Sequence, residues 1–308
     1  MSQAKGPNLA ASVHSRLLNN RRQTGTDPNL IWSRFAMERL LYRLASSKHA
    51  DGFVLKGAML FLAWTGKTYR PTYDLDLLGF GEDSGPRLVS VFQDLCRMKV
   101  EPDGLVFDAD SVKSEPIREE QEYHGQRVTL SALLGKARIR IQVDIGFGDV
   151  ITPQAEQLAY PTLLDFPAPL VRACSRETVV AEKLHAMSVL GIANSRMKDF
   201  YDLRVLARDF DFEGKTLVAA LKATFKRRKT DIPAGLPLAL TDEFGQDKVK
   251  AVQWAAFIRK SGLEQPAPSL VEVLSHLREF LELPLRAASA EASCPKHWHP
   301  GGPWEQGN

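Results

Sequence analysis

Two aspartates, Asp74 and Asp76, stand two residues apart in the run TYDLDLLGF. Acidic and apolar side chains alternate here, which predicts a strand over 72–80 with both carboxylates on one face, about 6–7 Å apart. Anions that close raise each other's pKa unless a cation lies between them. Mg²⁺ prefers oxygen ligands and commonly uses one or two carboxylates together with phosphates. The pair is therefore a candidate metal site, although two solvated acids on an edge strand would give the same pattern.

A third acid, Asp144, follows the same logic. It lies on the polar face of a strand predicted over 137–147, whose other face carries Ile139, Ile141, Val143 and Ile145. Three carboxylates on two neighbouring strands, with no protein cation between them, can hold two metal ions. That arrangement suits in-line attack of a hydroxyl on a phosphoryl group, with pyrophosphate as the leaving group.

The segment KGAMLFLAW, upstream of the acids, predicts a buried helix that starts at Gly57. A glycine there lets a helix N-terminus approach a triphosphate, whose negative charge the helix dipole favours. Lys56 ends the strand expected over 52–55. It is either a phosphate contact or a solvated lysine, and the sequence leaves both open.

The run LKGAMLFLAWTGKTYRPTYDLDLLGF resembles the first motif of the AbiEii/AbiGii toxin nucleotidyltransferases, within the DNA polymerase β-like nucleotidyltransferase superfamily. That motif has a Lys-Gly-Gly-like start, an Arg and a Ser or Thr before the acids, and then Asp-Leu-Asp. In Ala58 the chain departs from the family's second small residue, Gly or Ser, so only backbone N–H groups would contact phosphate there. The resemblance implies metal binding by Asp74, Asp76 and Asp144, and nucleotide binding by Lys56, Gly57, Ala58, Arg70 and Thr72.

The segment SRETVVAEKLHAMSVLGIANSRMKDFYDLRVLA resembles later motifs of the same family, a Glu-Lys-Leu segment followed by Lys-Asp-x-Tyr-Asp. The resemblance implies that Lys183 is a catalytic residue that contacts the triphosphate. It also implies that Asp199 and Asp202 share one helix face and lie near the nucleotide. There they would orient the nucleotide, Arg196 or Lys183. Without the resemblance, Lys198 and these two acids would be ordinary surface salt pairs, each worth a few tenths of a kcal/mol.

The elements around these motifs predict two lobes, an α/β (α+β) lobe over residues 1–170 and an all-helical lobe over 171–308. The boundary follows a Pro-rich passage that begins near residue 152. The first lobe is a nucleotidyltransferase-like mixed sheet with further strands expected near 104–108, 114–122 and 126–134, flanked by helices at 9–22, 28–48 and 86–99. The second has helices expected at 176–191, 196–209, 214–229, 245–261 and 269–282, and an irregular C-terminal tail.

Composition excludes several classes of protein. Of 308 residues, 44% are hydrophobic and 25% charged, which is typical of globular chains and not of disordered or fibrous ones. The three cysteines give no disulfide framework, and neither a secretory signal nor an apolar membrane span is visible. We therefore expect a cytoplasmic protein without membrane association.

The net charge of +3 implies no general attraction to nucleic acid, but the charge is uneven. Residues 1–50 carry eight Lys/Arg against two Asp/Glu, and residues 222–229 carry five Lys/Arg. Each segment is either a solvated helix face or a surface for an RNA backbone.

Other candidate sites are weaker. Cys294, His297 and His299 have zinc-binding side chains, but the zinc spacing lacks a second ligand pair, which favours chance donors in a flexible tail. His185, within a predicted helix, is interpreted as a structural or supporting group. The sequence has no G-x-S-x-G, Walker-type or Rossmann motif, which removes the usual hydrolase, P-loop and dinucleotide-binding interpretations.

These patterns lead to one hypothesis: a Mg²⁺- or Mn²⁺-dependent nucleotidyltransferase that moves NMP from an NTP to a hydroxyl, with its active site between the two lobes. The resemblance implies the toxin of a toxin–antitoxin or phage-defence pair, with a cognate antitoxin and with tRNA as the RNA acceptor. Two alternatives stay open, a small-molecule nucleotidyltransferase of the antibiotic-modifying type and a non-catalytic NTP-binding partner protein.

Overall fold

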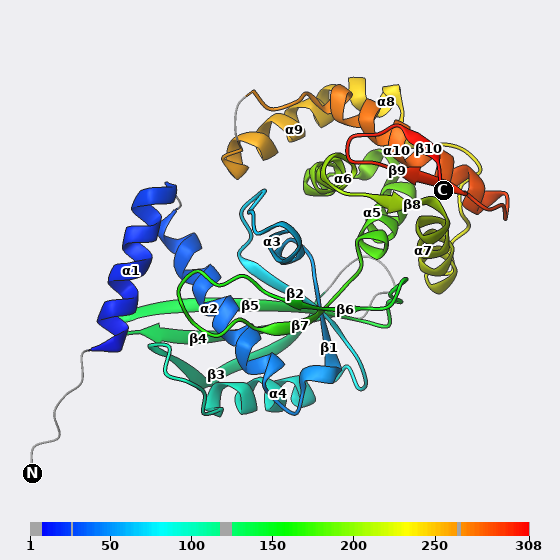
Figure 1. Ribbon diagram of the computed structural model, residues 1–308. Helices are drawn as coiled ribbons and strands as arrows, with labels where there is room; N and C mark the ends of the chain where they lie inside the picture. Colours follow the sequence, from blue (N-terminus) through cyan, green and yellow to red (C-terminus); the bar gives the residue numbers. More distant parts are fainter. Residues whose placement is uncertain (1–7, 26, 118–124, 264–265, 308) are drawn as a thin grey trace, which may run out of the picture. The chain divides into compact units, whose positions relative to one another are not determined.

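The computed structural model describes residues 8–25, 27–117, 125–263 and 266–307, and the chain forms two compact units (Figure 1). The first unit runs up to Gly148 and includes Glu156–Ala173. The second comprises Asp149–Ala155 and the chain from Cys174 onward. The chain therefore crosses from one unit to the other three times, around the Pro-rich passage.

A seven-stranded mixed sheet organises the first unit. Its spatial order is β3-β4-β5-β2-β1-β7-β6, with β2/β5 and β1/β7 parallel and the other neighbours antiparallel. This confirms the predicted mixed α/β fold. The strands are β1 Phe53–Lys56, β2 Asp74–Gly79, β3 Leu105–Ile117, β4 Gly125–Leu134, β5 Ala137–Phe147, β6 Glu156–Ala159 and β7 Leu170–Ala173.

The helices of the first unit begin at clear sequence signals. The Asp27 carboxylate accepts hydrogen bonds from the N–H groups of Asn29 and Leu30 (2.9 and 3.2 Å), and Pro28 takes the first helical position of α2. Helix α2 lies against β5 and β7, and α4 lies against β3 and contacts α2 (Figure 1). The helices are α1 Leu9–Thr24, α2 Pro28–Ala45, α3 Met59–Thr65 and α4 Gly85–Arg97.

Alternation along β5 sorts its side chains between the two faces of the sheet. Ile141, Val143 and Ile145 are at most 1% exposed, whereas Gln142 and Asp144 between them are half-buried. Leu75 and Leu77 on β2 are buried in the same way. One face of the sheet is thus core, and the other presents polar side chains.

Seven-residue helix α3 starts two residues later than the sequence predicts. Gly57 has a φ of +67°, in the left-handed region, so it cannot be part of a right-handed helix. Gly57 and Ala58 instead form a turn between β1 and the first residue of α3, Met59.

Three other departures concern strands and helix length. Strand β3 is one strand with a register shift between Asp108 and Lys113, where the sequence suggested two separate strands; residues 118–122 of the second lie outside the described residues. The Pro-rich passage contributes β6 and β7, because its short extended segments pair with each other and with β1. Helix α10 continues through Pro284 to Ser289, beyond the predicted end at residue 282.

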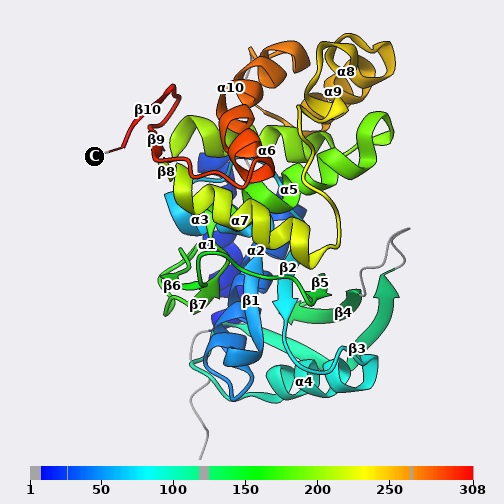
Figure 2. The same ribbon diagram turned by 90° about the vertical axis from the view of Figure 1, so that its right-hand side faces the viewer.

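The second unit is mostly helical, as predicted, and also contains a small three-stranded antiparallel sheet, β8-β9-β10 (Figure 2). The predicted all-helical lobe and irregular tail omit this sheet. The helices are α5 Arg176–Leu190, α6 Met197–Asp209, α7 Gly214–Arg227, α8 Asp242–Gln246, α9 Lys248–Ser261 and α10 Leu270–Ser289; the strands are β8 Phe212–Glu213, β9 Lys296–Trp298 and β10 Trp304–Gln306.

Two tryptophans fix the C-terminal hairpin, despite its Gly and Pro content. Trp298 is fully buried, and its indole N–H donates to the Ala207 carbonyl at 2.7 Å. The Trp304 indole donates to the Phe280 carbonyl at 2.9 Å and stacks on the Phe280 ring. Burial of large aromatic rings with their polar atoms satisfied outweighs the weak strand propensity of the segment.

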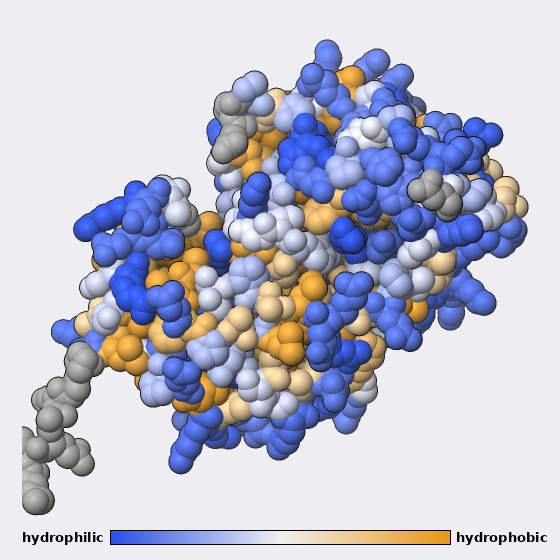
Figure 3. Space-filling model, viewed as in Figure 1, coloured by the Kyte–Doolittle hydropathy of each residue, from blue (hydrophilic) through white to orange (hydrophobic). Residues whose placement is uncertain are grey.

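In the described residues, no helix has both the length and the apolar character needed to cross a membrane. The face of the second unit visible in Figure 3 is mostly hydrophilic, as expected where helices expose charged side chains to water.

Candidate active site

Four strands bring charged side chains into one row across the polar face of the first unit's sheet. Lys56 on β1 is the register partner of Asp76 on β2, and Asp76 is the partner of Asp144 on β5. Asp144 in turn is the partner of Arg127 on β4. Since neighbouring strands lie about 4.8 Å apart, each of these residues is beside the next. The sheet therefore juxtaposes two of the three sequence-predicted acids directly.

The third acid, Asp74, lies two residues from Asp76 at the first position of β2. Its register partner is Gln142, which points to the same face as Asp144. Both aspartates of β2 are half-buried, and Leu75 between them is fully buried. The three carboxylates thus form one group on one face, in the arrangement that the alternation predicts.

Arg127 changes the electrostatics expected for this group. Its Nε and Nη2 atoms donate to the two carboxylate oxygens of Asp144, both at 2.8 Å, in a bidentate pair. The Gln142 amide donates to the same oxygens at 3.2 and 3.3 Å. The expectation that no protein cation lies among the acids is therefore wrong, because an arginine from β4 reaches Asp144.

This pairing also acts on the arginine. The hydrogen bonds that Arg127 donates to Asp144 raise the pKa of its guanidinium, and its attraction to Asp144, Asp74 and Glu115 acts in the same direction. Arg127 is 36% exposed and Asp144 20% exposed, so water still screens the pair. Arg127 and Gln142 are the site residues that the sequence analysis missed. Both lie on polar positions of alternating strands, but the register that joins them to Asp144 is not readable from the sequence.

Gly57 makes close contact with the carboxylate of Asp76. A Cβ built at Gly57 would lie 2.6 Å from the Cγ of Asp76 and would overlap its Oδ2. Since the backbone φ is also positive, both the space and the conformation require glycine here. The turn of Gly57 and Ala58 therefore runs directly against a metal-binding candidate, which explains why a glycine follows Lys56.

Arg70 and Thr72 lie in the loop between α3 and β2. The Arg70 guanidinium donates to the carbonyl of Pro71 at 3.4 Å, and the Thr72 hydroxyl donates to the carbonyl of Asp74 at 3.2 Å. Thr72 thus holds the backbone at the start of β2. Both side chains are half-buried and within a few residues of the acids along the chain.

A second charged cluster joins α5 and α6 in the second unit. The Lys183 ammonium lies 2.6 Å from Asp199 Oδ1 and 2.9 Å from Asp202 Oδ2. The other oxygen of Asp199 lies 2.9 Å from Arg196 Nε. The two aspartates are at most 3% exposed, whereas Lys183 is 14% exposed. Asp199 and Asp202 thus orient Lys183 and Arg196 directly, and they are not surface salt pairs.

His185, two residues further along α5, has a structural environment. Its Nε2 lies 3.1 Å from the Thr230 hydroxyl, and its Nδ1 lies 3.2 Å from Arg228 Nη1. Arg228 also donates to Asp149 at 3.2 Å. Part of the basic run over 222–229 therefore points into the unit, and Lys226 and Lys229 are exposed.

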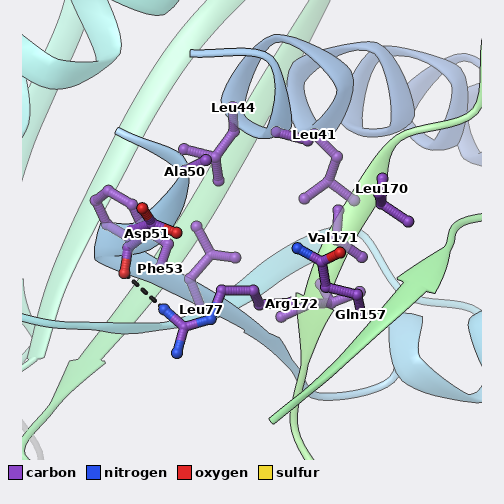
Figure 4. A pocket seen from close by; sticks show the side chains of 12 residues that line it. Leu41, Leu44, Ala50, Asp51, Phe53, Leu77, Gln157, Leu170, Val171 and Arg172 are labelled. Carbon is purple, nitrogen blue, oxygen red and sulfur yellow. Dashed lines mark hydrogen bonds between the residues drawn. The ribbon is translucent and has the colours of Figure 1, made fainter. Parts of the chain in front are cut away.

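A pocket of about 140 Å³ lies on the other face of the first unit's sheet (Figure 4). It is lined by Leu41 and Leu44 of α2, by Leu55 of β1 and by Leu77 of β2. Leu55 and Leu77 alternate with the site residues on their strands, so the pocket opens away from the acids. It is apolar apart from its rim, and we assign no nucleotide to it.

Comparison with known proteins places this geometry in a family. A family model described as the nucleotidyl transferase AbiEii toxin of type IV toxin–antitoxin systems matches residues 39–276. No curated protein matches the sequence at a significant level. Among solved structures, a candidate nucleotidyltransferase from H. pylori is 15% identical, with 86% of this chain and 95% of that chain covered and a TM-score of 0.47. JHP933 from Helicobacter pylori is 14% identical, with 86% and 92% covered and a TM-score of 0.47.

The matched residues extend over well more than half of the chain and include both groups of motifs, the acids of β2 and β5 and the charged cluster of α5 and α6. The resemblance seen in the sequence is thereby confirmed at the level of the family. The chain belongs to the AbiEii toxin family, and it is a nucleotidyltransferase.

Proposed function

We propose that the enzyme transfers NMP from an NTP to a hydroxyl group at the 3′ end of tRNA, with divalent metal, as the toxin of a toxin–antitoxin pair in the cytoplasm. The observation that carries this proposal is the group of three carboxylates on one sheet face, with Asp76 and Asp144 in register and Asp74 two residues away. Carboxylates so close to each other favour a divalent cation with phosphate ligands.

The donor set fits Mg²⁺ or Mn²⁺, because it consists of carboxylate oxygens and contains no thiolate or imidazole. Asp74 and Asp76 would hold the metal, and Asp144 would complete the site. When bound, divalent ions would activate the attacking hydroxyl and stabilise the charge of the leaving pyrophosphate. The glycine turn lets the backbone run directly against the Asp76 carboxylate, because the space that a Cβ would take is occupied by that side chain.

In the proposed reaction, the acceptor hydroxyl oxygen forms a bond to the α-phosphorus, and the bond from that phosphorus to the bridging oxygen of the pyrophosphate breaks. The hydroxyl proton passes to Asp144. Lys56, Arg70 and Lys183 offset the negative charge of the triphosphate, with Thr72, Ala58, Asp199 and Asp202 in positioning roles. Preorganised positive charge of this kind accelerates phosphoryl transfer more than it tightens ground-state binding.

An RNA acceptor is supported by exposed basic side chains on helices of both units. Arg21 and Arg22 are exposed in the last turn of α1, and Lys226 is exposed in the last turn of α7. Such side chains offset phosphate charge and make affinity salt-dependent. We expect Lys226→Gln to lower the slope of log affinity against log salt by about 1 while NTP binding is kept.

The test is incubation of the protein with each α-labelled NTP, Mg²⁺ and total RNA, followed by a denaturing gel and a pyrophosphate assay. We expect label in a tRNA-sized band, and Asp76→Asn should lower the rate by on the order of 10³ or more. Asp110→Asn is the control, because Asp110 is an exposed strand carboxylate outside the site. If an added aminoglycoside is labelled and RNA is not, the acceptor is a small molecule and not tRNA. NTP binding without release of pyrophosphate would contradict the proposed catalysis.

A further inference from the structure

The polar face of the small sheet in the second unit carries a cluster of imidazole and carboxylate groups. His297 on β9 is the register partner of Glu213 on β8 and of Glu305 on β10. His299 follows β9 directly, and Asp211 precedes β8. Asp211 and Glu213 lie about 85 positions before His297 in the chain, and strands β8, β9 and β10 lie together at one side of the unit (Figure 2).

Three ligand atoms converge in this cluster. Asp211 Oδ1 lies 3.0 Å from His297 Nε2 and 3.4 Å from His299 Nδ1, and the two rings have centroids 4.4 Å apart. One ligand atom from each of the three residues lies within 4.8 Å of the others. A tetrahedral zinc ion with bonds of about 2.0–2.1 Å separates its ligands by roughly 3.3–3.4 Å. The two separations from Asp211 are close to this value, and the ligand nitrogens of the two histidines lie within 4.8 Å of each other.

The outward nitrogens of both histidines give a second, independent observation. His297 Nδ1 lies 2.9 Å from Glu213 Oε1, and His299 Nε2 lies 3.8 Å from Glu305 Oε2. In metal sites, the imidazole nitrogen that does not bind the metal commonly donates to a carboxylate, which fixes the ring and makes the ligand more basic. Here each ring faces the shared Asp211 with one nitrogen and a different glutamate with the other.

The scaffold beneath the cluster is closely packed. Trp298, between the two histidines, is fully buried, and its indole is hydrogen-bonded to the backbone of α6. Its ring also contacts those of Phe280 and Trp304. Since ligands held by packed elements lose little entropy on binding, the donors are preorganised for an ion.

We infer that Asp211, His297 and His299 form a binding site for a divalent transition metal of the zinc type, with Glu213 and Glu305 as the carboxylates that orient the histidines. Imidazole nitrogens select zinc-type ions over Mg²⁺, which prefers oxygen ligands alone. Because the histidines and Asp211 are partly exposed, water takes the remaining position. The ion ties the C-terminal hairpin to the segment between α6 and α7, and it takes no part in nucleotidyl transfer.

The test uses the full chain, freed of metal by chelator and titrated with Zn²⁺ by calorimetry in excess Mg²⁺, which keeps the acids of the first unit occupied. We expect one tight zinc site per chain. His297→Gln and His299→Gln should each weaken it by about 100-fold, and Glu213→Gln, which keeps all three ligands, by about 10-fold. His14→Gln, which changes a histidine of α1 in the first unit, and Asp76→Asn should leave the zinc affinity within threefold.

Hydrogen exchange gives a second measurement that does not depend on nucleotidyl transfer. Zinc should slow exchange in peptides that contain Lys296–Trp298 in the wild type and in His14→Gln, and should not do so in His297→Gln. The inference is overturned if zinc binds the wild type and His297→Gln equally, if Asp76→Asn removes the tight site, or if no zinc binds. If His297→Gln does not fold, Glu213→Gln provides the test. Unchanged zinc affinity in Glu213→Gln would contradict the inferred role of the carboxylates that orient the histidines.

Discussion

The two charged clusters that match the family motifs are built in opposite ways. On the sheet of the first unit, three carboxylates meet two cations, Lys56 and Arg127, and the side chains are half-buried. Between α5 and α6, two almost fully buried carboxylates meet two cations, Lys183 and Arg196. The charged side chains of the first cluster thus remain partly accessible, whereas the carboxylates of the second are almost completely enclosed.

The difference in burial implies that the second cluster stabilises its fold, in addition to the proposed contact of Lys183 with the triphosphate. Neighbouring carboxylates that remain partly accessible are favourable ligands for a divalent cation, so the sheet cluster is suited to metal chemistry. Two buried carboxylates without their cations would each carry a large desolvation cost, so Lys183 stabilises its unit whatever else it does. A loss of activity on removal of Lys183 therefore needs a stability measurement beside it.

Lys183→Met is expected to have the largest effect on stability. It leaves Asp199 and Asp202 buried with one cation fewer, which costs about 3–5 kcal/mol of unfolding free energy. Urea unfolding followed by circular dichroism measures this. Lys226→Met, an exposed lysine of α7, is the control and should cost less than about 0.5 kcal/mol. Equal effects of the two substitutions would contradict the structural role of the cluster.

A double variant sharpens the same comparison. Lys183→Met combined with Asp202→Asn should recover part of the lost stability, because the carboxylate charge of Asp202 is then gone while Asp199 keeps Arg196. Lys183→Arg should keep the fold and restore turnover only in part, since a planar guanidinium does not reproduce a compact ammonium.

The two units should also respond to pH in opposite directions. Burial and the positive charge of Arg228 lower the pKa of His185, in the second unit, to about 4, against the opposing effect of Asp149. The unfolded chain then binds more protons than the folded one between pH 4 and 6.5. The stability from His185 is therefore present above pH 6.5 and is lost as the pH falls toward 4.

Glu38, in the first unit, has the reverse sign. Burial raises the pKa of its carboxyl to about 7 from 4.5, although the N–H of Leu163 donates to it at 2.7 Å. Here the folded chain binds more protons, so the stability from Glu38 is present below pH 4.5 and is lost as the pH rises through 7. The pKa shift of each group changes the free energy of unfolding by at most about 3 kcal/mol over the pH range between its folded and unfolded pKa values.

Native-state hydrogen exchange resolves these opposite trends. Between pH 5 and pH 8 the opening free energy, corrected for intrinsic exchange, should fall for peptides of α2 and rise for peptides of α5. Glu38→Gln should remove the first trend alone, and His185→Gln the second alone. Parallel trends in the two units of the wild type would contradict the assignment of both groups.

A pair of glycines at the two ends of α3 tests the accessible cluster. Gly57 and Gly66 have nearly the same φ, +67° and +69°, so alanine costs about 1–2 kcal/mol of backbone strain at either position. Only at Gly57 does the new Cβ meet Asp76; at Gly66 nothing lies within 4 Å. We expect Gly57→Ala to cost about 1–3 kcal/mol more than Gly66→Ala and to lower turnover selectively. Equal turnover in the two variants would show that the position of Asp76 is not critical.

Local sequence patterns predicted the parts of this molecule that depend on near neighbours in the chain. Period-two alternation placed Asp74 and Asp76 on one face, and the Asp27–Pro28 pair marked the start of α2. The sequence could not give the register between β4 and β5, which decides that Arg127 reaches Asp144, because many registers keep the same buried face. Contacts between distant segments set register, and a single sequence does not contain them in readable form.

The structure of the C-terminal hairpin also depends on contacts with distant segments, which the sequence does not reveal. The Gly, Pro and Ser content of this segment predicts irregular structure. Cys294, His297 and His299 did not indicate a zinc site, because the sequence around them lacks the second pair of ligands that zinc motifs have. In the inferred site the further donor is Asp211, more than 80 residues earlier, and Cys294 is buried and is not among the three ligands. Spacing rules find sites whose ligands are close in sequence, and this one is assembled by strand pairing.

Arg127→Gln has the smallest expected effect and tests whether the sheet cluster prefers a ligand to its own arginine. The pair with Asp144 is half-exposed, so its loss should change the free energy of unfolding by only about 0–1 kcal/mol. In the proposed site a metal ion at Asp144 has to compete with Arg127 for the same carboxylate oxygens, so removal of that competitor should tighten Mn²⁺ binding by up to about fivefold. Calorimetry with Mn²⁺ measures this, with Arg138→Gln on the same sheet as the control, since its contact with Asp108 is only a 4.0 Å ion pair. Weaker Mn²⁺ binding in Arg127→Gln would mean that the arginine holds Asp144 in place for the metal, so that the bidentate pair belongs to the active geometry and is not displaced on binding.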